Sequence, residues 1–137
     1  MTSISKKLTA KKLVEEEGTR GSVKLTAKQM QLFKDSVLLW QRKLWLQRYK
    51  VFTTMESMDS VAKAYISEPD QVSVIAINEA LVWWDMDETI QKAGLHECLE
   101  LLLHEITDEL EKYCSDNRIN TMVHRVIRTL ENVLYEE

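Results

Sequence analysis

The chain has 137 residues and a formal net charge of −4; 45% of its residues are hydrophobic and 29% are charged. This length suits one hydrophobic core and is short for two, and the net negative charge gives no general electrostatic reason to bind nucleic acid. One proline and three glycines leave no flexible linker and favour a helix-rich fold.

Residues 1–24 form a basic N-terminal segment with six Lys and Arg against three Glu, about +3, which leaves −7 for the rest of the chain. The segment has few large apolar residues, so we expect a flexible arm with at most a short helix over 10–17, capped by Thr9. Such an arm can contact nucleic acid or an acidic protein face, or it is merely solvated. We expect residues 25–137 to form a single domain.

Residues 25–47 predict the first long helix, because Thr26 and Gln29 have the spacing of a capping box. Apolar residues then recur at threes and fours: Met30, Phe33, Val37, Trp40 and Leu44. Three β-like runs follow, at 48–55, 61–67 and 71–78. A helix, three strands and then helices predict an α+β domain with a small, mostly antiparallel three-stranded sheet.

Two helices are predicted to close the chain and to pack against each other. The first begins at an Asp85 and Glu88 capping box and runs to about Tyr113, and the second covers 118–137. Its apolar residues predict one packing stripe: Ile119, Met122, Val126, Leu130 and Val133.

Cys98 and Cys114 lie in the same predicted helix, about 24 Å apart at 1.5 Å per residue, which is beyond disulfide reach. We therefore expect free thiols in a reducing cytoplasm. The longest apolar run is far below the ~20 residues of a membrane span, so we expect a cytoplasmic protein without membrane contact. No phosphate-binding glycine loop, serine triad order or CxxC pair supports nucleotide, serine-hydrolase or thiol redox chemistry.

The segment HECLELLLHE, which starts at His96, begins like the zinc-peptidase signature H-E-x-x-H. In that signature two histidines four residues apart bind zinc, and the intervening Glu is the general base. Here Glu100 replaces the second histidine, and a carboxylate is also a zinc ligand. If metal binds, we expect His96 and Glu100 as ligands and Glu97 as the catalytic base.

A helical wheel puts His96 and Glu100 at the edge of the apolar face of this helix. Glu97 and His104 lie farther from the apolar face, and His104 is most simply a surface histidine. The wheel therefore permits a partly buried site built from the first two side chains.

Four motifs follow one another in the run from Phe33 to Glu131: FKDSVLLWQRKL, VIAIN, AGLHE and VHRVIRTLE. Their order and spacing resemble the short zincin-like metallopeptidase domains of bacteriophages and prophages. The resemblance implies a zincin-like single domain encoded by a phage or prophage and present in the cytoplasm of the host cell.

The chain departs from this family pattern at two ligand positions. The second histidine would fall on residue 100, which is Glu100, and an acidic residue would fall on 123, which is Val123. The wheel turns Val123 inward and puts His124 on the polar side, beside Glu131. His124 could serve as a third metal ligand only if this helix is rotated or the site lies at its flank.

Three hypotheses remain open. The main one is a degenerate, metal-free zincin-like fold without a cofactor that acts as a non-catalytic module and binds a host or phage protein. The second is a small zinc-dependent metallopeptidase or hydrolase with a variant HExxE site. The third is that the motif is accidental and that His96 is hydrogen-bonded at the core edge to a neighbour such as Glu100.

Tryptophans supply the candidate protein-binding surface. Of the adjacent Trp83 and Trp84 we expect one in the core and one outside, and Trp45 cannot share the stripe of Trp40. We expect a protein partner, and the wide apolar face from Leu95 to Leu110 also suggests a homodimer. We do not expect nucleic acid to bind, except through the basic arm.

Overall fold

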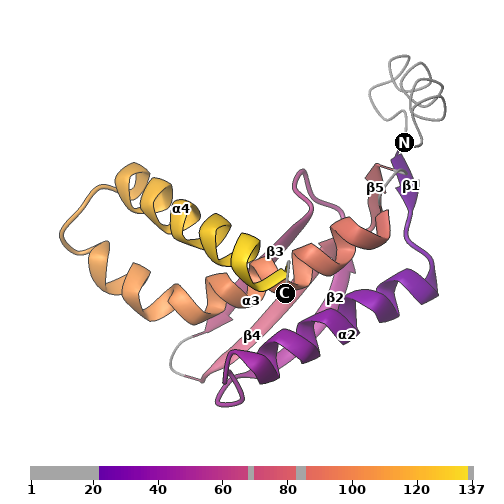
Figure 1. Ribbon diagram of the computed structural model, residues 1–137, viewed down its shortest axis with the longest axis horizontal. Coiled ribbons are helices and arrows are strands. Elements are labelled where there is room, and N and C mark those ends of the chain that lie inside the picture. Colours follow the sequence, from indigo (N-terminus) through magenta and orange to yellow (C-terminus); the bar gives the residue numbers. More distant parts are fainter. Residues whose placement is uncertain (1–21, 68–69, 83–85, 136–137) are drawn as a thin grey trace.

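The computed structural model describes residues 22–67, 70–82 and 86–135. The helices are α2 (Ala27–Lys43), α3 (Met86–Leu110) and α4 (Asp116–Tyr135). The strands are β1 (Ser22–Lys24), β2 (Lys50–Glu56), β3 (Ala62–Ser67), β4 (Val72–Asn78) and β5 (Ala80–Val82) (Figure 1). This content confirms the predicted α+β fold class.

Several predictions fall on residues outside the described ranges. They concern the arm up to residue 21 with its helix capped by Thr9, the pair Trp83 and Trp84, and the capping residue Asp85. The last residues of the predicted arm are described, and they form β1, which pairs antiparallel with β5. Strands of three residues are too short to give the alternation by which strands are predicted.

Helix α2 begins at the predicted capping box. The Thr26 hydroxyl accepts a hydrogen bond from the Gln29 N–H at 3.1 Å, and the Gln29 side chain accepts one from the Thr26 N–H at 3.0 Å. The helix ends before the predicted residue 47, because Trp45 adopts a left-handed backbone with φ 58. The N–H groups of Trp45 and Leu46 then donate to the last carbonyls of the helix, an ending that usually employs glycine.

The three-stranded sheet has the order β2-β4-β3. β3 pairs antiparallel with β4, whereas β2 pairs parallel with it, so the sheet is mixed where mostly antiparallel pairing was expected. β4 is the most apolar of the three strands, and Ile75, Ala76 and Ile77 are completely buried at its central position. β4 thus lies between β2 and β3, although β2 and β3 are consecutive in the sequence.

Helices α2 and α3 cover one face of the sheet, and α4 packs on α3 (Figure 1). α2 and α3 run in the same direction, since Gln29 contacts Met86 and the Cys98 thiol donates to the C=O of Val37. The fully buried apolar side chains lie between these layers: Phe33, Val37, Leu46, Ile75, Ile77, Ile90, Leu95, Cys98, Leu99, Leu101 and Ile127. α2, α4 and the sheet thus surround α3 on several sides, so its buried residues are not confined to one stripe.

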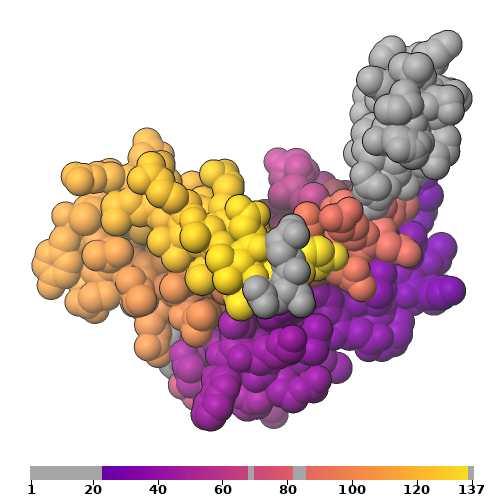
Figure 2. Space-filling view, in the orientation of Figure 1, coloured from indigo at the N-terminus to yellow at the C-terminus, as the bar shows by residue number. Residues whose placement is uncertain are grey.

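Helix α4 packs on a different stripe from the predicted one. Ile119 is buried and Leu130 is partly buried as expected, but Met122, Val126 and Val133 are half-exposed. The residues that pack toward α3 and the core are instead Ile119, Val123, Ile127, Leu130 and Leu134. At 100° per residue this corresponds to a rotation of the helix by about 60°. The α3–α4 hairpin then forms a lobe that extends to one side of α2 (Figure 2).

Both cysteines are free, Cys98 in the core and Cys114 on the surface, as the sequence predicted. No helix in the described part of the chain combines the length and the apolar character needed to cross a membrane.

The contact between Gly94 and Ser36 permits the close approach of α2 and α3. A Cβ atom added at Gly94 would lie 2.3 Å from the hydroxyl oxygen and 2.7 Å from the Cβ of Ser36. Although alanine favours helices, we expect Gly94→Ala to lower the free energy of unfolding by about 1–3 kcal/mol through overpacking. Urea denaturation measures this change.

Ser36→Ala in the same chain should not relieve the Gly94→Ala variant, because the Cβ atom of residue 36 remains. Ser36→Gly removes both clashing atoms and should recover part of the lost stability. A Gly94→Ala variant as stable as the original chain would show that the helices do not approach this closely.

Candidate metal centre

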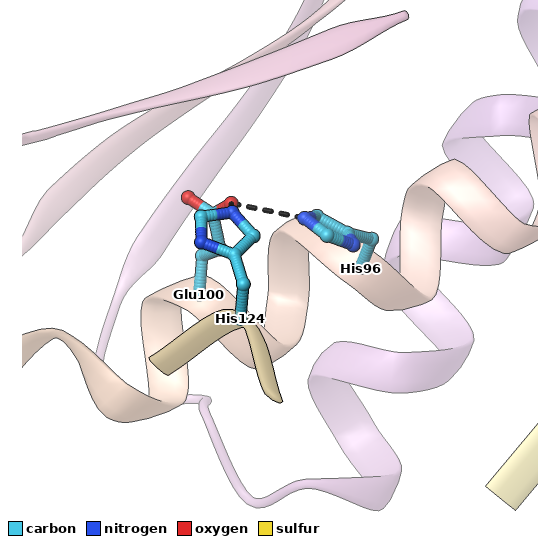
Figure 3. A group of neighbouring side chains, drawn as sticks. All are labelled: His96, Glu100 and His124. Carbon is cyan, nitrogen blue, oxygen red and sulfur yellow. Dashed lines mark hydrogen bonds and ion pairs between the residues drawn. The ribbon is translucent and has the colours of Figure 1, made fainter. Parts of the chain in front are cut away.

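Three side chains from two helices converge beside the sheet. His96 and Glu100 lie four residues apart on α3, and His124 reaches them from α4 (Figure 3). One possible ligand atom from each lies within 4.8 Å of the other two, a grouping that could hold a metal ion. These are the three residues that the sequence analysis named as candidate ligands.

The rotation of α4 accounts for the presence of His124 in this group. With the core-facing stripe shifted toward Val123 and Ile127, His124 lies at the flank of the helix next to α3 rather than on its outer side. The His124 Nε2 atom is 3.7 Å from the Glu100 carboxylate, and the two imidazole rings are 5.8 Å apart. This is the flank position that the sequence analysis gave as a condition for a third ligand.

Each histidine has its Nδ1 atom engaged with a hydrogen-bond acceptor of α4. The Nδ1 of His96 lies 2.6 Å from the Glu131 carboxylate, and the Nδ1 of His124 lies 2.9 Å from the C=O of Asn120. When both Nδ1 atoms donate, both Nε2 atoms face Glu100. In metal proteins the same outer contacts orient histidine ligands.

The carboxylates around His96 favour its protonated form. The hydrogen bond to Glu100, at 3.0 Å from Nε2, is the main cause that raises the pKa of His96 from 6.5 to about 9. Burial opposes this shift, and the hydrogen bond to Glu131 reinforces it. In the absence of metal, His96 is therefore an imidazolium held between two carboxylates near neutral pH, and its predicted hydrogen bond to Glu100 is present.

Glu97 is buried, contrary to the helical wheel. Its side chain is 4% exposed, and its Oε1 atom has no hydrogen-bond partner. Burial raises the pKa of this carboxyl to about 7, and repulsion from Glu100 adds to the effect while His96 opposes it. The wheel assumed a single buried face, whereas the sheet covers a second side of α3. The structure therefore holds at this point a carboxyl that can take up and release a proton near neutral pH.

Two hollows flank the group. One of about 460 Å³ is lined by Glu100, His104 and His124 together with Ala64 and Ile66 of β3. The other, of about 380 Å³, is lined by His96, Glu97 and Glu131 together with Val61 and Ala62. Both sides of the candidate centre thus have space next to the same edge strand.

The remaining candidate residues have separate positions. His104 is partly buried in the wall of the larger hollow, outside the three-residue group, and Val123 packs inward as predicted. Trp45 follows the end of α2, and its side chain is 83% exposed to solvent rather than buried in the core. The contacts of Glu131 and Asn120 with the histidines could not be predicted, because no motif in the sequence reports which α4 atoms face α3.

Comparisons of the chain with protein families, curated proteins and solved structures found no match.

The raised pKa of His96 predicts how the stability of the metal-free protein depends on pH. The stabilisation from protonated His96 is complete below pH 6.5 and is lost as the pH rises through about 9. At 1.36 kcal/mol per pKa unit, we expect the free energy of unfolding to fall by about 2–3 kcal/mol between pH 6.5 and 9. Urea denaturation in the presence of a chelator measures this fall.

The His96→Gln variant should have a clearly smaller fall over the same pH interval, whatever its stability at pH 6.5, and the part that remains comes from Glu97, whose pKa is also raised. His104→Gln, on the same helix but outside the group, should keep the fall. An equal fall in His96→Gln would mean that another residue titrates.

Proposed function

We propose that the protein is a small zinc-dependent hydrolase whose metal is held by His96, Glu100 and His124. The observation that carries the proposal is the orientation of the two histidines. Both Nδ1 atoms are engaged by acceptors on α4, and both Nε2 atoms face the same carboxylate. Outer contacts of this kind orient the histidine ligands of metal proteins.

The residues fit zinc in number and in kind. Two imidazoles and one carboxylate are a frequent donor set of catalytic zinc, and three protein ligands leave a position open. The resemblance to zincin-like domains leads to the same donor set, with histidine at 100 and an acid at 123. In this chain the types are exchanged: Glu100 supplies the carboxylate from α3, and His124 supplies the second imidazole from α4.

Zinc bound at this position would act as a Lewis acid on a carbonyl group and on water. Glu97 is suited to the proton transfers of hydrolysis, because its unpartnered oxygen is buried in the wall of the hollow that contains His96. It would accept a proton from the attacking water and return it to the leaving nitrogen of an amide. In the metal-free protein, burial raises the pKa of this carboxyl to about 7.

A peptide is the substrate class that the surroundings favour. β3 is an edge strand, and its residues line the hollows on both sides of the group. An extended peptide alongside this edge would pass next to the three proposed ligands, with room for side chains on either side of the cleaved bond.

A non-catalytic, phage- or prophage-encoded module that binds a host or phage protein is the second candidate. It is favoured by the ion pairs of His96, which satisfy Glu100 and Glu131 without any metal, and by the exposed indole of Trp45. Exposed tryptophans are frequent anchors of protein interfaces. In this hypothesis the cluster stabilises the α3–α4 contact and has no chemical role.

Zinc titration of chelator-treated protein tests the first proposal. We expect one zinc per chain, and its loss in His96→Ala and Glu100→Ala. Glu131→Gln should weaken binding about 10–100-fold, since it removes only an outer contact. Because zinc must displace the proton of His96, the apparent affinity should rise about tenfold per pH unit between pH 6 and 8.

His104→Ala is the matched control, since this histidine lies on α3 outside the group, and it should bind zinc normally. Folded protein that binds no zinc in this titration would contradict the hydrolase and leave the binding module as the better explanation.

The Glu97→Gln variant separates metal binding from chemistry. We expect it to bind zinc as well as the original chain and to cleave peptides about 10²–10⁴-fold more slowly, because the proton acceptor is lost. Mass spectrometry of a mixed peptide library incubated with the zinc-loaded protein measures the cleavage. Cleavage that is unchanged by Glu97→Gln would assign the base to another residue.

A further inference from the structure

The second border of the sheet is formed by β2, whose outer side has no strand partner in the described part of the chain. Within the described residues β2 pairs only with β4. The Lys50 N–H donates to Gln71 and the Glu56 C=O accepts from Glu79, so the even-numbered residues of β2 bond toward β4. By the alternation of a strand, Val51, Thr53 and Met55 direct their N–H and C=O groups outward.

The middle of this edge has none of the features that normally prevent strand addition. β2 reads KVFTTME, with no proline, no bulge in its register with β4, and charges only at its two ends. The Phe52 side chain is 52% exposed and that of Met55 is 43% exposed. Natural proteins protect such edges with charges, prolines or bulges, so an unprotected edge of this length indicates a pairing surface.

The strand is complementary to itself in an antiparallel arrangement centred on Thr53. In that register Lys50 lies opposite Glu56 of a second copy at both ends, and Val51 lies opposite the second copy's Met55. The outward backbone groups of the two copies also match. Val51 of one copy lies opposite Met55 of the other, and Thr53 lies opposite Thr53. All of their N–H and C=O groups would be paired. A shift by one residue would lose both the charge pairs and the backbone pairs.

Helix α2 supplies an apolar contact beside the same edge. Leu38 is 56% exposed and lines a groove of about 300 Å³ with Val51, Phe52 and Thr53. Thr53 would lie on the twofold axis, so the two copies of Leu38 would approach each other above the joined strands.

We propose that the protein forms a homodimer in which two β2 strands pair antiparallel about Thr53 and join the two sheets into one. The partner surface is a second copy of this chain, selected by the Lys50 and Glu56 pairs at the ends and by Leu38 beside the strands. The pairing is independent of metal and of the proposed hydrolysis, because the β3 edge and the candidate centre lie at the opposite border of the sheet.

Sedimentation equilibrium of the full chain over a range of concentrations tests the proposal. We expect a species of twice the chain mass of 16.0 kDa at high concentration. Lys50→Glu and Glu56→Lys each bring like charges together at both ends and should raise the dimer dissociation constant about tenfold or more. The variant that carries both substitutions should recover the original constant, which a merely destabilised fold would not do.

Leu38→Asp should also weaken the dimer, and Val126→Asp is its control, because Val126 is a similarly exposed apolar residue on α4. Amide hydrogen exchange gives a second readout, since the N–H groups of Val51, Thr53 and Met55 should be protected only in the dimer. A chain that stays monomeric at all concentrations would overturn the proposal. So would a dimer that is indifferent to Lys50→Glu and Leu38→Asp, or a dimer that appears only after residues 1–21 are removed.

Discussion

The contact of 2.6 Å between His96 and Glu131 is the interaction on which the geometry of the candidate centre depends. It joins α3 to α4 at a point where both side chains are largely buried, so the charge pair is weakly screened by solvent. The same contact orients the His96 ring, while the core-facing apolar residues of α4 set the rotation that brings His124 to Glu100. Loss of Glu131 would therefore disturb the orientation of the ring more than the position of the helix.

A proton and a metal ion compete for one position in this cluster. Without metal, the proton on His96 Nε2 faces Glu100 and partly neutralises the carboxylates of Glu100 and Glu131. A metal ion would replace that proton and use the same carboxylate. The metal-free and the metal-bound protein would use the same side chains, because the proton and the metal ion would each lie between His96 and Glu100. The cluster thus offers the same carboxylate of Glu100 to either cation.

Local features of this chain could be predicted from the sequence, and long-range ones could not. The capping box, the boundaries of the three main strands and the pairing of His96 with Glu100 follow from spacings of a few residues. The apolar run of β4 is typical of a central strand, but nothing in the local sequence predicts that β2 pairs parallel with it. The rotation of α4 was ambiguous because the helix has two adjacent apolar stripes, and only contact with α3 selects between them. Glu97 was misplaced because a wheel cannot represent a helix that is covered on several sides.

The two borders of the sheet have different chemical character, and this difference separates their roles. The β3 border lies next to charged groups of α3 and α4 and to two hollows, so a strand added there would meet the candidate metal centre. The β2 border has an uncharged middle, complementary ends and an apolar helix residue, which suit a second copy of the same strand. Because β4 lies between them, pairing at β2 leaves β3 free. A dimer joined in this way would carry its two candidate centres at the outer borders of one continuous sheet, each open to its own ligand.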